Sequence, residues 1–169
     1  MNKCFCNNKI LICNDLPFIY KISSFSYSIS GLHMIFNKEH CIKYIFSYAY
    51  FWNSYAFLLV VVSFTSFLSD TFYVGINNSI YYNIDIFVAF ITFIYTLFYT
   101  ILLRNVNNKQ SFCFFICILL ALKFKLQGAK YLNNKNLNMY YMYHSLWHYI
   151  LPTIGILVLE LNIKYIQSI

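Results

Sequence analysis

The chain of 169 residues is rich in apolar side chains and poor in charged ones: 60% of its residues are hydrophobic, 22% aromatic and 10% charged. A soluble globular domain carries about 25% charged residues. This composition therefore excludes that class, as does a mean hydropathy of +0.59. With 18 Phe and 17 Tyr but only 4 Gly and 2 Pro, the chain is neither disordered nor collagen-like. These numbers indicate an integral membrane protein.

The formal net charge of +7 comes from 12 Lys and Arg against 5 Asp and Glu. An excess of positive charge is also found in proteins that bind nucleic acid. Here, however, the basic residues stand singly or in loose pairs between apolar runs. Lys and Arg flank membrane-spanning helices at the water interface in this way. We therefore expect no nucleic-acid partner.

Three segments are long and apolar enough to be clear membrane spans: 44–69, 85–103 and 139–160. The hydrocarbon core is ~30 Å thick and an α-helix rises 1.5 Å per residue, so about 20 apolar residues cross it. The connections between segments are short, and no repeat or linker divides the chain. We therefore treat 1–169 as a single transmembrane domain.

Two further segments are weaker candidates for spans. Segment 17–37 carries Lys21 and many serines, which is typical of a helix packed against other helices rather than against lipid. Segment 110–126 includes Lys123 and Lys125, whose long side chains can reach the interface while the helix crosses. The predicted fold is an all-α, polytopic transmembrane helix bundle of about five spans.

The distribution of positive charge favours neither orientation of this bundle. With five spans, six lysines fall on one side of the membrane and five lysines or arginines on the other. The positive-inside rule needs a larger difference than this. The endomembrane system and the plasma membrane both stay open as locations.

The most informative segment is YHSLWH, in which His144 and His148 stand four residues apart within the last span. Residues at this spacing lie on the same face of a helix, so both imidazoles can reach one metal ion. Several zinc enzymes supply part of their ligand set in this way. The alternative is a pair of histidines hydrogen-bonded to neighbouring helices.

Two carboxylates accompany the histidines if the chain crosses the membrane as predicted. Asp70 follows one span and Asp85 begins the next. If 110–126 crosses, these carboxylates, His144 and His148 all lie near one membrane face. If it does not cross, the histidines lie on the opposite face. Charged groups inside a membrane segment are costly unless paired, so each is a candidate functional residue.

Ser66 stands four residues before Asp70, Asp85 begins the following helix, and an H-x-x-x-H motif lies in the last helix. The combined pattern resembles the CREST superfamily of seven-helix membrane proteins. The superfamily includes the alkaline ceramidases, the progestin and adiponectin receptors, the GPI-lipid remodelling proteins and the myomaker-type transmembrane proteins. The H-S-L-W-H run is most similar to the myomaker-type branch. The resemblance covers about 60–90 and 138–152.

This resemblance implies a zinc site, because such proteins hold zinc with three histidines. It assigns His144 and His148 as two metal ligands and places Asp70 where the family has its third histidine. A carboxylate also ligates zinc, at ~2.0–2.2 Å. The resemblance further implies catalytic roles for two residues. Asp85 would accept a proton from water, and Ser66 would hydrogen-bond the developing oxyanion or a ligand.

The resemblance also implies the class of function. Its enzymes hydrolyse amide or ester bonds in lipids, which predicts a zinc-dependent hydrolase with a membrane lipid as partner. The alternatives are a non-enzymatic, myomaker-like protein in membrane remodelling or fusion, and a multi-span protein whose His pair is coincidental. Other membrane subunits stay open as partners. Only 73 residues separate Asp70 from His144, which leaves room for one helix besides the span 85–103, where the family has three.

Overall fold

The computed structural model describes residues 4–6, 9–11, 16–37, 39, 49–72 and 80–167. Within them a short antiparallel strand pair precedes six helices. The elements in chain order are β1 (Cys4–Cys6), β2 (Lys9–Leu11), α1 (Phe18–Ser23), α2 (Phe25–Phe36), α4 (Ala49–Phe72), α5 (Ile80–Val106), α6 (Asn108–Asn133) and α7 (Leu137–Gln167). The predicted all-α bundle is thereby confirmed.

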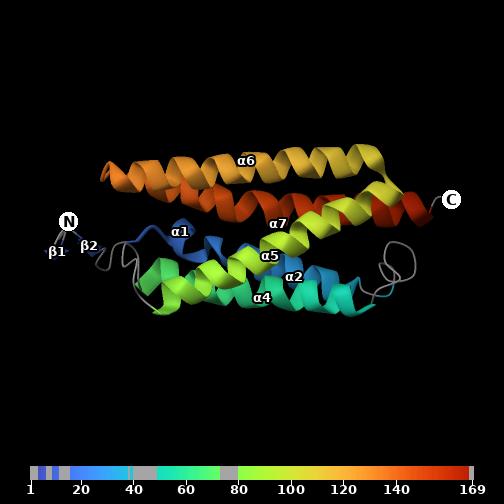
Figure 1. Cartoon of the computed structure of the whole chain (residues 1–169), viewed down its shortest axis with the longest axis horizontal. Coiled ribbons are helices and arrows are strands. Elements are labelled where there is room, and N and C mark those ends of the chain that lie inside the picture. Colours follow the sequence, from blue (N-terminus) through green and yellow to red (C-terminus); the bar gives the residue numbers. More distant parts are fainter. Residues whose placement is uncertain are drawn as a thin grey trace.

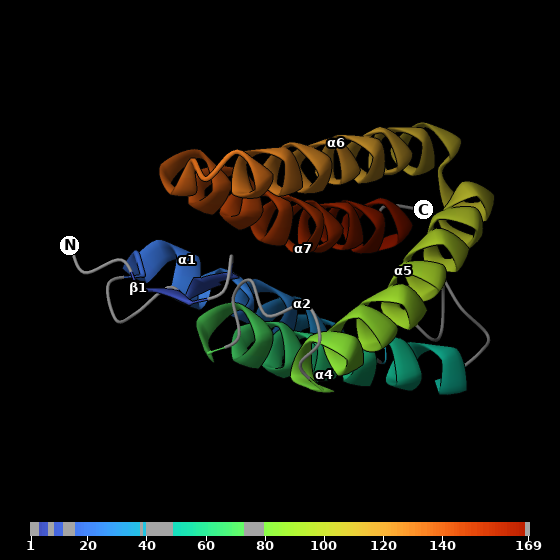
Figure 2. The same cartoon turned by 60° about the vertical axis from the view of Figure 1, so that its left-hand side comes forward.

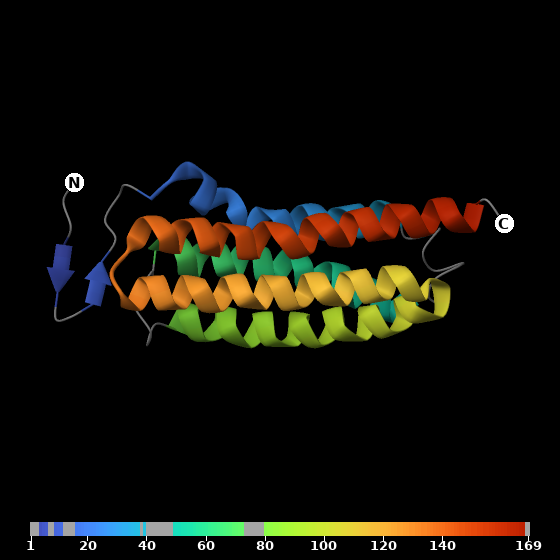
Figure 3. The ribbon, with the colours of Figure 1, turned by 90° about the horizontal axis from the view of Figure 1, so that it is seen from above.

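The long helices run along a common axis (Figure 1). α6 packs along α7, and α2 packs between α4 and α7. α5 crosses obliquely, from a start beside α4 to an end beside the beginning of α6 (Figures 1 and 2). Viewed from above, α2 lies next to α7 and α5 next to α6 (Figure 3). The end of α4, the start of α5, the end of α6 and the start of α7 therefore lie at one end of the bundle.

Four of the described helices are long enough and apolar enough to cross a membrane. They are Tyr50–Thr71, Ile80–Arg104, Asn108–Asn133 and Leu137–Lys164. The chain is accordingly an integral, multi-pass membrane protein.

The helices extend further than the uncharged segments that predict them. α5 begins at Ile80, before Asp85, and α6 continues past Lys125 to Asn133. Lysine is a good helix former, so a charge marks where the apolar stretch ends and not where the helix ends. Residues 44–48 of the predicted span 44–69 lie outside the described part of the chain.

Segment 17–37 forms two helices instead of one. α1 ends at Ser23, and α2 begins after Ser24. Neither helix is among the four that meet the length for a span. α2 nevertheless packs closely on α4 at Gly31. The backbones are so near there that a Cβ atom added at Gly31 would lie only 2.7 Å from the carbonyl oxygen of Ala56.

Small residues also bring α6 close to α7. Ala121 and Gly128 are buried on the face of α6 that contacts α7. A Cβ atom added at Gly128 would lie 3.7 Å from the backbone nitrogen of His144. The approach of α6 therefore positions the segment of α7 that carries the histidine pair.

Candidate metal centre

The start of α7 is set by a tight turn and a cap. Lys135 adopts a left-handed backbone conformation with φ of 57°. The side-chain oxygen of Asn136 then accepts a hydrogen bond from the backbone N–H of Met139 at 3.3 Å. An Asn in this role satisfies one of the free N–H groups at a helix N-terminus. His144 and His148 follow within the next four turns, on one face of the helix.

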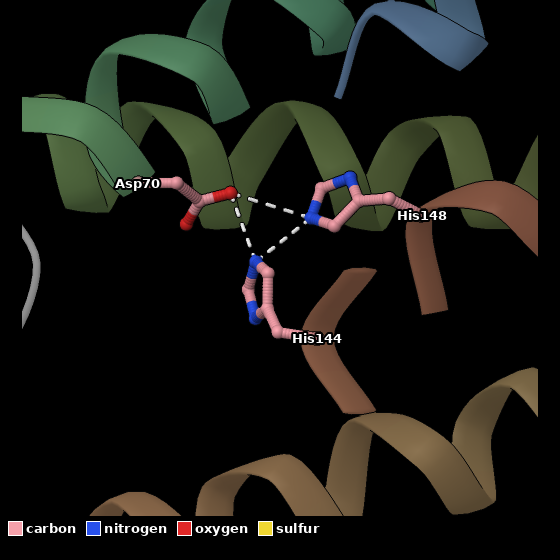
Figure 4. Close-up of side chains that lie close together, drawn as sticks. All are labelled: Asp70, His144 and His148. Carbon is pink, nitrogen blue, oxygen red and sulfur yellow. Dashed lines mark hydrogen bonds and ion pairs between the residues drawn. The ribbon is translucent and has the colours of Figure 1, made fainter. Parts of the chain in front are cut away.

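The two histidines converge with Asp70, which lies near the end of α4 (Figure 4). His144 Nε2 lies 2.9 Å from Asp70 Oδ2 and 2.9 Å from His148 Nε2. His148 Nε2 lies 3.3 Å from the same carboxylate oxygen. The three ligand atoms thus surround one point, although Asp70 and His144 differ by 74 in residue number.

This arrangement fits a zinc ion in both ligand type and spacing. Imidazole nitrogen and carboxylate oxygen are zinc ligands, with bonds of about 2.0–2.2 Å. In a tetrahedral site such bonds separate neighbouring ligand atoms by about 3.3 Å. The distances of 2.9–3.3 Å are those of direct hydrogen bonds and an ion pair between the side chains, and they equal this value or lie up to about 0.4 Å below it. Three protein ligands leave one position open, as catalytic zinc sites do.

The cluster is largely buried, which makes the charge on Asp70 significant. The side chains of Asp70, His144 and His148 are 13%, 19% and 3% exposed. A carboxylate removed from water requires a nearby positive charge or strong hydrogen bonds. Protonated imidazole or a bound cation can supply that charge here.

Aromatic side chains hold the imidazoles in place. The rings of Tyr20 and Tyr140 each lie 5.2 Å from the ring of His144, measured between centroids. Their hydroxyls contact each other at 3.2 Å. The ring of Tyr27 meets that of His148 edge-on at 5.5 Å. Packing of this kind restricts the rotamers that both histidines can adopt.

The Nδ1 atom of His148 departs from the usual pattern of metal sites. A ligating histidine normally donates its second ring N–H to a carboxylate, a carbonyl or water. His148 Nδ1 is buried and has no hydrogen-bond partner among the described residues. The backbone oxygen of His148 is held instead, by the hydroxyl of Ser26 at 2.6 Å.

Ser66 and Asp85 form a second pair beside the cluster. Ser66 lies one turn before Asp70 on α4, and its hydroxyl donates to Oδ1 of Asp85 at 2.6 Å. Thr65 donates to the same oxygen at 3.3 Å. The carboxylates of Asp85 and Asp70 interact electrostatically. Asp85 is not one of the three converging ligands.

The structure thus brings together all five residues singled out from the sequence. Three form the ligand cluster, namely Asp70, His144 and His148, and the other two form the adjacent pair, Ser66 and Asp85. Sequence reasoning missed Thr65. Its hydroxyl group and its position next to Ser66 could have identified it. It also missed the tyrosines around His144, because no local pattern marks residues that meet only in the folded bundle.

A small pocket lies deeper in the bundle, beyond Tyr27. Its lining includes Tyr55, Tyr99, Phe114 and Leu151. Its free volume is about 30 Å³. A water molecule needs about 10–15 Å³ by this measure, so the pocket admits water and not a lipid chain.

No family model matches the sequence, and no curated protein or solved structure is similar enough to it to count as a match. The resemblance to the CREST superfamily therefore rests on the motif residues.

Proposed function

We propose that the chain is a zinc-dependent membrane protein of the CREST type that hydrolyses an amide or ester bond of a membrane lipid. The observation that carries this proposal is the convergence of three zinc-type ligand atoms from two helices beside a hydrogen-bonded Ser–Asp pair. A coincidental His pair in YHSLWH would not require a carboxylate from α4 to meet both imidazoles.

Asp70, His144 and His148 would hold the zinc. A zinc ion acts as a Lewis acid, polarising a carbonyl group and making a coordinated water acidic enough to lose a proton near neutral pH. The Asp85 carboxylate lies beside the cluster and would accept that proton. Ser66 donates to Asp85 Oδ1 and therefore orients the carboxylate. Ser66 is thus a positioning residue in this proposal.

One observation favours a second function. The three ligand atoms come from α4 and α7, so a metal held by them would join two helices of the bundle. A structural metal needs only such ligands, whereas a hydrolase also needs space for its substrate beside the metal. In this second function the metal stabilises the bundle, and the protein acts in membrane remodelling or fusion, as the myomaker-type proteins do.

The metal content of the detergent-purified protein tests whether the site binds zinc. We expect about one zinc per wild-type chain and none in the double variant His144→Ala/His148→Ala. His33→Ala is the matched control, because His33 pairs with Glu160 at the other end of the bundle. A folded wild-type protein without zinc would contradict both functions.

A lipid-cleavage assay separates the two functions. Wild-type protein, zinc-stripped protein and Asp85→Asn are incubated with vesicles of ester-linked and amide-linked lipids, and released fatty acid is measured. If the protein is a hydrolase, we expect the wild type to release fatty acid. Asp85→Asn should release none although it still binds zinc. Zinc-loaded protein that cleaves no lipid would favour the structural role.

A further inference from the structure

Lys125 lies on α6 at the level of the metal cluster. Ala121 and Gly128 bring this part of α6 against α7. The Lys125 ammonium lies 5.0 Å from the ring centroid of Trp147, which immediately precedes His148. A cation over the face of an indole is attracted by the ring. This contact holds the ammonium beside the segment of α7 that carries the metal ligands.

Lys125 has no ion-pair partner in the described part of the chain. The ion pairs there join His33 to Glu160 and the two α7 histidines to Asp70, and none involves Lys125. A lysine within a membrane-spanning helix needs an anionic partner or access to water. Lys125 is exposed, so its partner can come from outside the chain.

Basic residues gather at the end of the bundle that carries Lys125. The lysines that α1, α6 and the turn before α7 contribute there are Lys21, Lys123, Lys125, Lys130 and Lys135. The described acidic residues at the same end are Asp70 and Asp85, and both belong to the site. Glu39 and Glu160 lie towards the other end. A basic surface at the membrane interface attracts anionic lipid headgroups.

We propose that Lys125 binds the phosphate of an anionic phospholipid headgroup beside the metal cluster, so that the lipid presented to the cluster is anionic and not neutral. This inference rests on the proposed function in one respect: the bound phospholipid is a substrate only if the metal cluster hydrolyses lipids. The binding itself requires only Lys125 and its surroundings. Trp147 would pack against the same headgroup region while holding the ammonium in place.

Native mass spectrometry of the detergent-purified chain, in an equal mixture of phosphatidylglycerol and phosphatidylcholine, tests the binding. We expect the wild type to prefer phosphatidylglycerol and Lys125→Met to reduce that preference about fivefold, the usual effect of one lysine near a membrane surface. Lys125→Arg should retain the preference, because the charge remains. Helical content and gel-filtration profile establish that each variant is folded.

Lys123→Met is the matched control, because Lys123 is exposed on the same helix but points in another direction two residues away. It should keep the preference of the wild type. Equal losses in Lys123→Met and Lys125→Met would overturn the proposal in favour of a diffuse basic surface. A wild type without lipid preference would also overturn it.

Two further measurements identify the ligand and separate this inference from the proposed function. Soluble glycerol phosphate should not displace the bound lipid, and displacement would overturn the assignment to a lipid headgroup. The His144→Ala/His148→Ala variant should still bind phosphatidylglycerol through Lys125. If the wild type holds no zinc but shows this Lys125-dependent binding, the metal function fails and the headgroup site stands. If the wild type binds zinc but shows no lipid preference, the headgroup site is overturned and the proposed metal site stands.

Discussion

The hydroxyl of Ser66 donates a 2.6 Å hydrogen bond to Oδ1 of Asp85, which links α4 to α5 one helical turn from Asp70. Asp70 in turn contacts both histidines of α7. Three helices are thereby connected through polar side chains at one end of the bundle. In a membrane protein such polar contacts join helices that apolar packing alone would not distinguish.

Replacing Asp70 should separate its role as a ligand from its role in packing. We expect Asp70→Ala to lower zinc affinity by at least about 100-fold, because loss of even an indirect partner of a metal ligand costs 10–100-fold. Asp70→His should retain zinc, since imidazole is also a zinc ligand. Competition with a chromophoric chelator measures both affinities. An unchanged affinity in Asp70→Ala would exclude Asp70 from the ligand set.

Removing the Ser66 hydroxyl should affect Asp85 without affecting zinc. Ser66→Ala loses a hydrogen bond to a charged group, which contributes about 1.5–3 kcal/mol. We expect a lower free energy of unfolding, slower lipid cleavage and an unchanged zinc content. Thr65→Ala should have a smaller effect, because its hydrogen bond is longer, at 3.3 Å. Loss of zinc in Ser66→Ala would instead show that Ser66 supports the ligands.

Stripping the metal should destabilise the wild-type protein. A ligand at 100 times its dissociation constant stabilises the folded state by about 2.7 kcal/mol, and its removal leaves a buried carboxylate without a cation. Thermal unfolding in detergent, followed by circular dichroism with and without a chelator, measures the change. The chelator should have no effect on His144→Ala/His148→Ala, and an equal shift in that variant would indicate a cause other than the site.

The contact between α2 and α4 should tolerate no side chain at position 31. A Cβ atom at Gly31 would lie 2.7 Å from the Ala56 carbonyl oxygen and 3.2 Å from Leu59 Cβ, so Gly31→Ala should destabilise the bundle by about 1–3 kcal/mol. Gly155→Ala is the matched control, because its nearest neighbours are 3.9 Å away. That variant should be neutral or more stable by up to about 1 kcal/mol. Equal melting temperatures for the two variants would contradict the close packing of α2.

The candidate site was accessible to sequence reasoning because its parts follow local rules. Two histidines four residues apart share a helix face, and Asp70 and Asp85 interrupt otherwise apolar segments. Bringing these parts to one end of the bundle depends on whether 110–126 forms a helix that returns the chain. The structure describes it as part of α6, which continues to Asn133.

Lys125 and Tyr20 illustrate what local patterns could not provide. In the sequence Lys125 is one of two lysines near the end of an apolar segment, and its neighbour Lys123 looks equivalent. Only the packing of α6 on α7 places Lys125 over Trp147. In the same way Tyr20 is one of 17 tyrosines, and only the position of α1 against α7 brings it to His144.

The sequence by itself determined that this is an all-α membrane protein, because composition and the length of apolar runs follow from the solvent in which each segment is stable. It also determined which ionisable residues are candidates for function, because charge in an apolar segment is rare. The tertiary structure decided which of these residues meet, and it decided that Lys125 and not Lys123 lies over Trp147, beside His148. Distances between helices depend on close packing such as that of Gly31 against Ala56, and this packing is a property of pairs of helices that no single segment contains.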